Sequence, residues 1–143
     1  MRKTSEAPRL LLDTHVWLWL VLGTAELSSK VRGTITDAAS VGTLWIAAIT
    51  IWEIALLASR NRVSLGKPTI RWIEEAVARS SVAIEPLSPQ IAVESWELPD
   101  RFHQDPVDRM IVATARLTGT MLMTRDRRIL DYAARGHLTV IGA

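Results

Sequence analysis

The chain of 143 residues contains no cysteine, which excludes disulfide bonds, thiolate zinc sites and cysteine nucleophiles. It also lacks an uninterrupted apolar run of the ~20 residues that a membrane-spanning helix needs. Residues 10–22 resemble the apolar part of a signal peptide, but Asp13 and His15 interrupt them. We therefore expect a soluble, cytoplasmic protein that is neither exported nor inserted in a membrane.

Several catalytic motifs are absent as well. The three histidines, His15, His103 and His137, do not form H-E-x-x-H, and no G-x-S-x-G elbow is present. No glycine-rich loop precedes Lys67 to cradle phosphates. A phosphotransferase of the Asp-x-Asp type would need an acid at position 15, where a histidine stands. These absences argue against four common enzyme chemistries.

Most of the basic residues are arginines, with fourteen arginines against three lysines. The net charge of the chain is only +2. Arginine favours forked contacts with phosphate, so nucleic acid is a plausible partner. Residues 101–128 hold six arginines against three acids, a local surplus of three. The alternative interpretation of this surplus is an ordinary solvated rim.

The pattern of apolar segments predicts one α/β domain over residues 9–143, after a disordered N-terminal extension at residues 1–8. Short apolar strands alternate with helical segments, which favours a central parallel sheet of four or five strands. Strands are expected at residues 9–13, 43–49, 82–85, 121–124 and 138–141. Helices are expected at residues 15–22, 28–39, 50–60, 69–79, from 88 to before 99, 105–119 and 127–135.

Acidic residues stand at the ends of separate apolar segments. Parallel strands present their carboxyl ends at one edge of a sheet, so these acids can converge there. Carboxylate oxygens are the ligands of hard divalent cations, and the pattern therefore indicates a metal site. The acids concerned are Asp13, Glu53, Asp105, Asp108 and Asp126.

Each acid also has a local explanation. Asp13, Asp105 and Asp126 stand where helices begin and are favoured N-cap residues. Asp108 lies three residues after Asp105, on the same helical face. Four clustered carboxylates would repel one another unless a cation or raised pKa values relieved them, and the joint explanation by a metal is the more economical.

Glu53 has a different local explanation, because Thr50 and Glu53 have the spacing of a capping box in the first turn of a helix. Against this, Glu53 follows Trp52 in an otherwise apolar turn close to the core, where a carboxylate would gain from a cation. Thr14 and Thr124 neighbour strand-end acids, and their hydroxyls either orient a carboxylate or serve the turn.

With these residues described, the chain resembles the PIN-domain ribonucleases, and most closely the VapC-like toxins of bacterial toxin–antitoxin pairs. The resemblance covers residues 9–142. It rests on LLLDTHVWLW, WEIA, HQDPVDRMIVATA and MTRD, which stand in the family's order and at its spacing. It implies a three-layer α/β/α PIN-like fold.

The resemblance implies hydrolysis of RNA phosphodiester bonds by a water activated at Mg²⁺ or Mn²⁺. Arg109, Arg125 and Arg127 could hold flanking phosphates, although each is better placed as peripheral than as catalytic. The residues carried over are an acidic quartet with one supporting acid and two accessory hydroxyls: Asp13, Glu53, Asp108 and Asp126, with Asp105, and Thr14 and Thr124.

The resemblance also implies a homodimer and a cognate antitoxin that blocks the site. Six tryptophans are more than one small core readily buries, which gives mild independent support for an interface. The alternative is that Trp17, Trp19, Trp45 and Trp52 are ordinary core residues. Two rival functions remain: a PIN nuclease of RNA processing, or a binding module that recruits RNA or protein without cutting.

Overall fold

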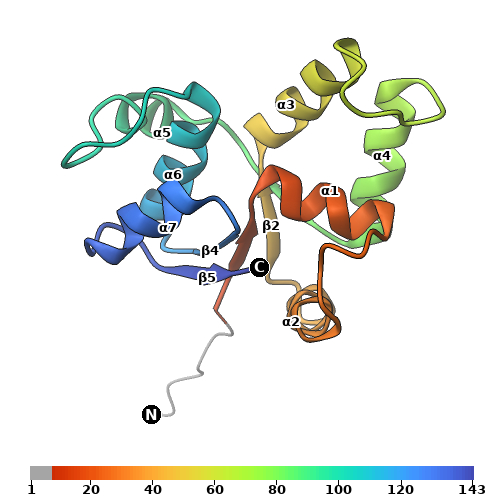
Figure 1. Ribbon diagram of the computed structural model, residues 1–143, viewed down its shortest axis with the longest axis horizontal. Helices are drawn as coiled ribbons and strands as arrows, with labels where there is room; N and C mark the ends of the chain where they lie inside the picture. Colours follow the sequence, from red (N-terminus) through yellow and green to blue (C-terminus); the bar gives the residue numbers. More distant parts are fainter. Residues whose placement is uncertain (1–7) are drawn as a thin grey trace.

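The computed structural model describes residues 8–143, which form a parallel sheet with helices on both faces (Figure 1). The predicted elements are all present. The N-terminal extension that was predicted to be disordered, residues 1–8, lies outside the described residues except for Pro8. The strands are β1 (Leu10–Leu12), β2 (Leu44–Ala47), β3 (Ala83–Glu85), β4 (Met121–Thr124) and β5 (Val140–Gly142). The helices are α1 (Thr14–Leu22), α2 (Ser29–Ser40), α3 (Ala48–Ser59), α4 (Thr69–Ser80), α5 (Pro89–Glu94), α6 (Pro106–Thr118) and α7 (Arg127–Ala134).

The five strands are ordered β3-β2-β1-β4-β5 and every pairing is parallel. The central strand β1 is apolar throughout because both faces are covered, as parallel sheets require. Leu10 and Leu12 pack with Trp17 on one face, and Leu11 packs with Ile111 on the other. Burying each leucine contributes ~1.5–3 kcal/mol. The predicted three-layer α/β/α architecture is confirmed.

Helices start at the carboxyl edge of the sheet with aspartate caps. Asp13, Asp105 and Asp126 are the N-cap residues of α1, α6 and α7, and each accepts hydrogen bonds from backbone N–H groups of its own helix. Gly23 ends α1 at a φ of 67°, a left-handed conformation in which glycine avoids the strain of a Cβ. The local explanation of the three aspartates as caps is therefore correct, whatever else they do.

The start of α3 differs from the prediction. Its N-cap is Ala47, and within residues 8–143 no side chain caps it. The helix begins at Ala48, so Glu53 lies in the second turn and the alternative explanation of Thr50 and Glu53 as a capping box is wrong. This start was not predictable from the sequence. The helix begins two residues before the expected Thr50, within an apolar run that has no polar N-cap residue.

The tryptophans divide between core and surface. Trp17 and Trp72 are buried, whereas Trp52 and Trp96 are each 55% exposed. Trp17 is thus a core residue as expected, and the assignment of Trp52 to the core is wrong because it points outward from α3 while Ile54 points inward. Of the helices in the described part of the chain, none combines the length and apolar character needed to cross a bilayer.

Arg109 is a buried structural residue of α6. Its side chain is covered, with its guanidinium 4.8 Å from the ring centre of Trp96. Nε donates to the carbonyl of Ser95 (2.7 Å), and one terminal nitrogen donates to the carbonyls of Phe102 and His103 (both 3.0 Å). The hypothesis that Arg109 holds RNA phosphates is therefore wrong, because its donors are used to fix the segment between α5 and α6.

Replacing Arg109 by alanine should lower the free energy of unfolding by about 3 kcal/mol, since it leaves three carbonyls without their donor. Arg109→Lys should recover only part of this loss, because an ammonium cannot reproduce the planar fork. Urea unfolding of both variants measures the effect, with Arg127→Ala on the exposed face of α7 as the control. A change below about 0.5 kcal/mol for Arg109→Ala would contradict this role.

Candidate active site

The acids meet in one cleft at the carboxyl edge of the sheet. From β1, the strand order runs outward through β2 to β3 on one side of the sheet and through β4 to β5 on the other. The topological switch point therefore lies between β1 and β4. Ligands of open α/β sheets bind at such a point. The cleft has a volume of about 330 Å³ and is lined by Asp13, His15, Val16, Trp19, Glu53, Asp105, Asp108, Arg125, Asp126 and Arg128.

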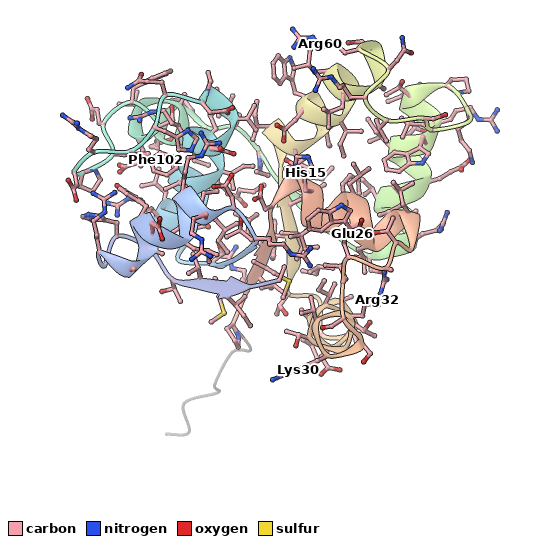
Figure 2. The ribbon with its side chains drawn as sticks, in the orientation of Figure 1. His15, Glu26, Lys30, Arg32, Arg60 and Phe102 are labelled. Carbon is pink, nitrogen blue, oxygen red and sulfur yellow. The ribbon has the colours of Figure 1, made fainter. Side chains whose placement is uncertain are left out.

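Figure 2 gives the setting of this cleft. His15 lies at the start of α1, and Phe102 lies on the side of the sheet that α6 covers. The five acids predicted from the sequence all line the cleft, although they come from four separate segments of the chain. Their assignment as metal ligands and catalytic residues stays a prediction.

Asp13 is the most buried of the acids, with 7% of its surface exposed. Oδ1 accepts a hydrogen bond from the backbone N–H of Thr14 (2.8 Å), and Oδ2 accepts one from the hydroxyl of Thr124 (2.7 Å). Burial raises the pKa of Asp13, while the bonds from Thr124 and Thr14 oppose the rise. The side chain is thus held by neighbours on β4 and α1.

Thr124 also connects to Asp126, whose backbone N–H donates to the Thr124 hydroxyl (3.0 Å). Asp126 in turn accepts from the backbone N–H groups of Arg128 (2.8 Å) and Ile129 (3.3 Å). The turn between β4 and α7 is therefore fixed by side-chain bonds at both ends. This arrangement explains why a threonine and an aspartate stand two residues apart in MTRD.

Asp108 lies in the first turn of α6 and does not cap it, because Asp105 does. Its Oδ2 is 3.1 Å from Nε2 of His103 and 3.9 Å from a terminal nitrogen of Arg128. Burial, followed by the charges of Asp13, Asp105, Asp126 and Glu53, raises the pKa of Asp108 to about 7. Asp108 is where the mutual repulsion of the cluster is concentrated.

Glu53 completes the cleft from α3. Burial is the main cause that raises its pKa, with smaller contributions from the charges of Asp13 and Asp105, while Thr14 hydrogen bonding lowers it. The Thr14 hydroxyl is also 3.0 Å from that of Thr50, and both threonines are fully buried. Thr50 therefore belongs to the site through Thr14, although the sequence had suggested a helix-capping role for it.

The donor set suits a hard divalent cation. It consists of carboxylate oxygens with neighbouring hydroxyls, which Mg²⁺ and Mn²⁺ prefer over nitrogen or sulfur. The raised pKa of Asp108 reflects repulsion that a cation would relieve. Within residues 8–143 no three acids or histidines already stand at ligand spacing, so binding would have to draw the carboxylates together.

The basic side chains of the cleft were only partly expected. Arg125 lines it, but one terminal nitrogen donates to the carbonyl of Glu26 and the guanidinium stacks on Trp19 at 4.6 Å. Arg127 is exposed outside the cleft lining, whereas Arg128 reaches in. Residue spacing did not single out Arg128, the second residue of α7, which lies 3.8 Å from Asp126 and 3.9 Å from Asp108.

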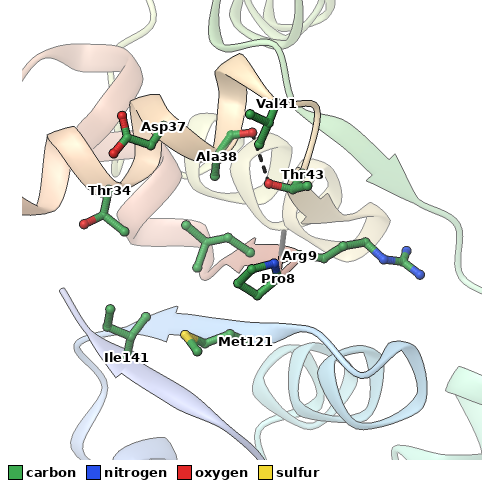
Figure 3. A pocket seen from close by; sticks show the side chains of 10 residues that line it. Pro8, Arg9, Thr34, Asp37, Ala38, Val41, Thr43, Met121 and Ile141 are labelled. Atoms are coloured by element: carbon green, nitrogen blue, oxygen red, sulfur yellow. Dashed lines mark hydrogen bonds between the residues drawn. The ribbon is translucent and has the colours of Figure 1, made fainter. Parts of the chain in front are cut away.

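A second hollow of about 290 Å³ lies at the opposite ends of the strands (Figure 3). Its walls are largely apolar, with Leu10, Val41, Met121 and Ile141 among them. Its charged lining residues are Arg9 and Asp37. This grouping offers no cluster of acids to a cation, so the carboxylate cleft is the candidate active site.

The raised pKa of Asp108 predicts a pH-dependent stability without divalent metal. Its pKa is 3.8 when unperturbed and about 7 in the fold. The contribution to stability is therefore complete below pH ~4 and is lost as the pH rises through ~7. Between pH 5 and pH 8 in EDTA, wild type should lose about 2 kcal/mol relative to Asp108→Asn, after a discount for solvent screening.

Urea unfolding at the two pH values tests this expectation. Asp131→Asn, an exposed change on α7 outside the cleft lining, is the matched control and should follow wild type. Parallel pH profiles for wild type and Asp108→Asn would show that Asp108 does not carry the repulsion of the cluster.

The whole domain matches known proteins. The family profile of the PIN domain matches residues 10–135. Ribonuclease VapC22 of Mycobacterium tuberculosis is 33% identical over 131 residues, which cover 92% of this chain and 97% of that protein. This extent of similarity is sufficient to establish a family.

Solved structures agree on the fold. VapBC2 from Rickettsia felis, bound to a promoter DNA fragment, matches with a TM-score of 0.69 and 14% identity, over 94% of this chain and 98% of that chain. A toxin–antitoxin complex from Klebsiella pneumoniae matches with a TM-score of 0.61 and 24% identity, over 92% and 95% of the respective chains. With the sheet order, the acid-lined cleft and these matches together, the chain belongs to the PIN-domain family and, within it, to the VapC ribonucleases.

Proposed function

We propose that this protein is a divalent-metal-dependent endoribonuclease and the toxin of a toxin–antitoxin pair. The observation that carries the proposal is the convergence of Asp13, Glu53, Asp108 and Asp126 on one cleft, where the pKa of Asp108 is raised to about 7. PIN ribonucleases are typically metal-dependent. A cluster that repels itself in the free protein is poised to bind a cation.

The four acids would hold the cation, and Asp105, which caps α6 with Oδ1, would support them. A bound Mg²⁺ or Mn²⁺ supplies Lewis-acid activation of water and positive charge beside the phosphate. Thr124 and Thr14 keep Asp13 in one orientation. In the reaction, water adds to phosphorus, one ester P–O bond breaks and the leaving oxygen takes up a proton.

RNA is the proposed substrate. The arginine excess of the chain supports contact with phosphates, and Arg128 at the cleft is 61% exposed along its side chain. Arg128 lies 3.8 Å from Asp126 and 3.9 Å from Asp108, so it can exchange a carboxylate for a phosphate when a cation neutralises the acids. Action on cellular RNA also implies a cytoplasmic location.

Partners are proposed from the relatives and from the surface. The Klebsiella pneumoniae relative was solved as a toxin–antitoxin complex. In this chain Trp52, Ile70 and Trp96 are each more than half exposed, and tryptophan is enriched at the centres of protein interfaces. We propose a cognate antitoxin and a homodimer as the occupants of such apolar surface.

Cleavage of RNA tests the proposed activity. Wild-type protein incubated with total RNA and Mn²⁺ or Mg²⁺ should produce discrete fragments, and EDTA should abolish them. Asp108→Asn should lower the rate by at least about 100-fold, because it removes a ligand and its charge. Asp13→Asn should also be inactive while remaining folded, since an asparagine can still accept the hydrogen bond from Thr14.

The matched control is Asp131→Asn, which makes the same chemical change on the exposed face of α7 and should cleave at the wild-type rate. Fragment ends are mapped by sequencing. Intact RNA with wild-type protein that binds RNA and metal would favour the non-catalytic binding module. Cleavage by wild type and Asp108→Asn at equal rates would exclude the acidic site.

Growth of cells tests the toxin assignment separately. Induced expression of wild type should arrest growth, and Asp108→Asn should not, because the arrest requires cleavage. Where a small reading frame lies immediately upstream in the genome, its co-expression should restore growth if it encodes the antitoxin, as colony counts would measure. An active nuclease that leaves growth unchanged would instead point to RNA processing.

A further inference from the structure

His103 lies in the segment between α5 and α6, and its position is fixed from several sides. Arg109 donates to the His103 carbonyl (3.0 Å) and to the neighbouring Phe102 carbonyl (3.0 Å). The imidazole ring packs on the ring of Phe102, with 4.4 Å between centroids. A segment outside helix and strand is thereby held by a buried guanidinium and an aromatic contact, which keeps the imidazole in place.

The hydrogen bonding of the ring sets its tautomer. Nδ1 accepts from the backbone N–H of Asp105 at 3.4 Å, so the proton of the neutral imidazole is on Nε2. The ring therefore presents one N–H group toward the cleft.

That N–H group faces Asp108. Nε2 is 3.1 Å from Oδ2 of Asp108, but the two are not aligned, and within residues 8–143 Nε2 is buried without a hydrogen-bond partner. Leaving a buried N–H unpaired costs ~1–3 kcal/mol, so an apolar ring would be the more stable occupant of a purely structural position. In the metal-bound protein, a rotation of the Asp108 carboxylate would align the pair.

We propose that His103 is a positioning residue of the metal site: its Nε2–H holds Oδ2 of Asp108 and thereby turns Oδ1 toward the divalent cation. This inference rests on the metal-dependent function proposed above. Arg128 approaches the same Oδ2 from α7 at 3.9 Å, so both basic side chains lie on the side of one oxygen and the other is left for the ion. Groups that orient a metal ligand typically change metal affinity 10–100-fold.

Two substitutions separate the positioning role from a packing role. The amide nitrogen of glutamine reaches the place of Nε2, whereas the shorter asparagine reaches only the place of Nδ1. His103→Asn should therefore weaken Mn²⁺ binding by about 10-fold or more, and His103→Gln should stay within about threefold of wild type. Calorimetric titration of the full chain with Mn²⁺ measures both, and thermal unfolding in EDTA checks that each variant is folded.

His137→Asn is the matched control, because His137 is also a partly buried histidine beside an aspartate, with Nε2 3.2 Å from Oδ2 of Asp100, outside the cleft lining. It should bind Mn²⁺ as wild type does. A second readout is the Mn²⁺ dependence of RNA cleavage. His103→Asn should need more Mn²⁺ for half-maximal rate and recover most of the wild-type rate at saturation.

The outcomes distinguish this inference from the function on which it rests. If wild type binds Mn²⁺ and cleaves RNA, but His103→Asn binds Mn²⁺ equally well, the positioning role is overturned and the nuclease stands. Equal losses in His103→Asn and His103→Gln overturn it too, because the loss would then follow the ring and not the donor. If wild type itself binds no Mn²⁺, both proposals fall.

Discussion

The N-terminal ends of α1, α6 and α7 meet at the carboxyl edge of the sheet, and the rest of the site depends on this meeting. Each of the three helices has an aspartate as its N-cap, whose side chain accepts hydrogen bonding from the backbone N–H groups of that helix. The partial positive charge of a helix N-terminus stabilises a carboxylate, so three acids can be brought together that would otherwise separate. The meeting of the three helix N-termini therefore explains both the aspartate caps and the clustering of the acids.

The residual repulsion is not shared equally. Asp13, Asp105 and Asp126 each accept a hydrogen bond from a backbone N–H group of their own helix, whereas Asp108 caps no helix, because Asp105 already accepts from the free N–H groups of α6. A carboxylate has two oxygens, and a residue can cap a helix with one and face the cleft with the other. From the sequence alone, helix capping and metal binding were alternative roles for these aspartates, but the fold is compatible with both roles at once.

Behind the acids, Arg109 shapes one wall of the site without entering it. It is buried between Trp96 and Phe102 and binds three carbonyls of the segment that leads into α6. His103 and Asp105 are presented by that segment. Arg109 follows Asp108 in the sequence but contacts the other side of α6, because one residue along a helix is a turn of about 100°.

The fold was predictable because its signals are local: apolar segments of strand length, glycine ends and aspartate or serine caps alternate along the chain. The predicted acids could also be placed at one edge, since parallel topology alone brings strand ends together. The start of α3, the buried position of Arg109 and the approach of His103 and Arg128 to Asp108 depend on tertiary packing, which residue spacing does not encode. The exposure of Trp52 beside the half-buried Glu53 has the same origin.

Thr124 has one hydroxyl proton, and its partners decide where that proton goes. The hydroxyl accepts from the Asp126 backbone, so its own proton is directed to Oδ2 of Asp13 at 2.7 Å. An oxygen that receives this proton offers a lone pair and cannot carry an acidic hydrogen of its own at that position. The orientation of one hydroxyl therefore favours the charged form of Asp13 and opposes part of the rise in its pKa that burial causes.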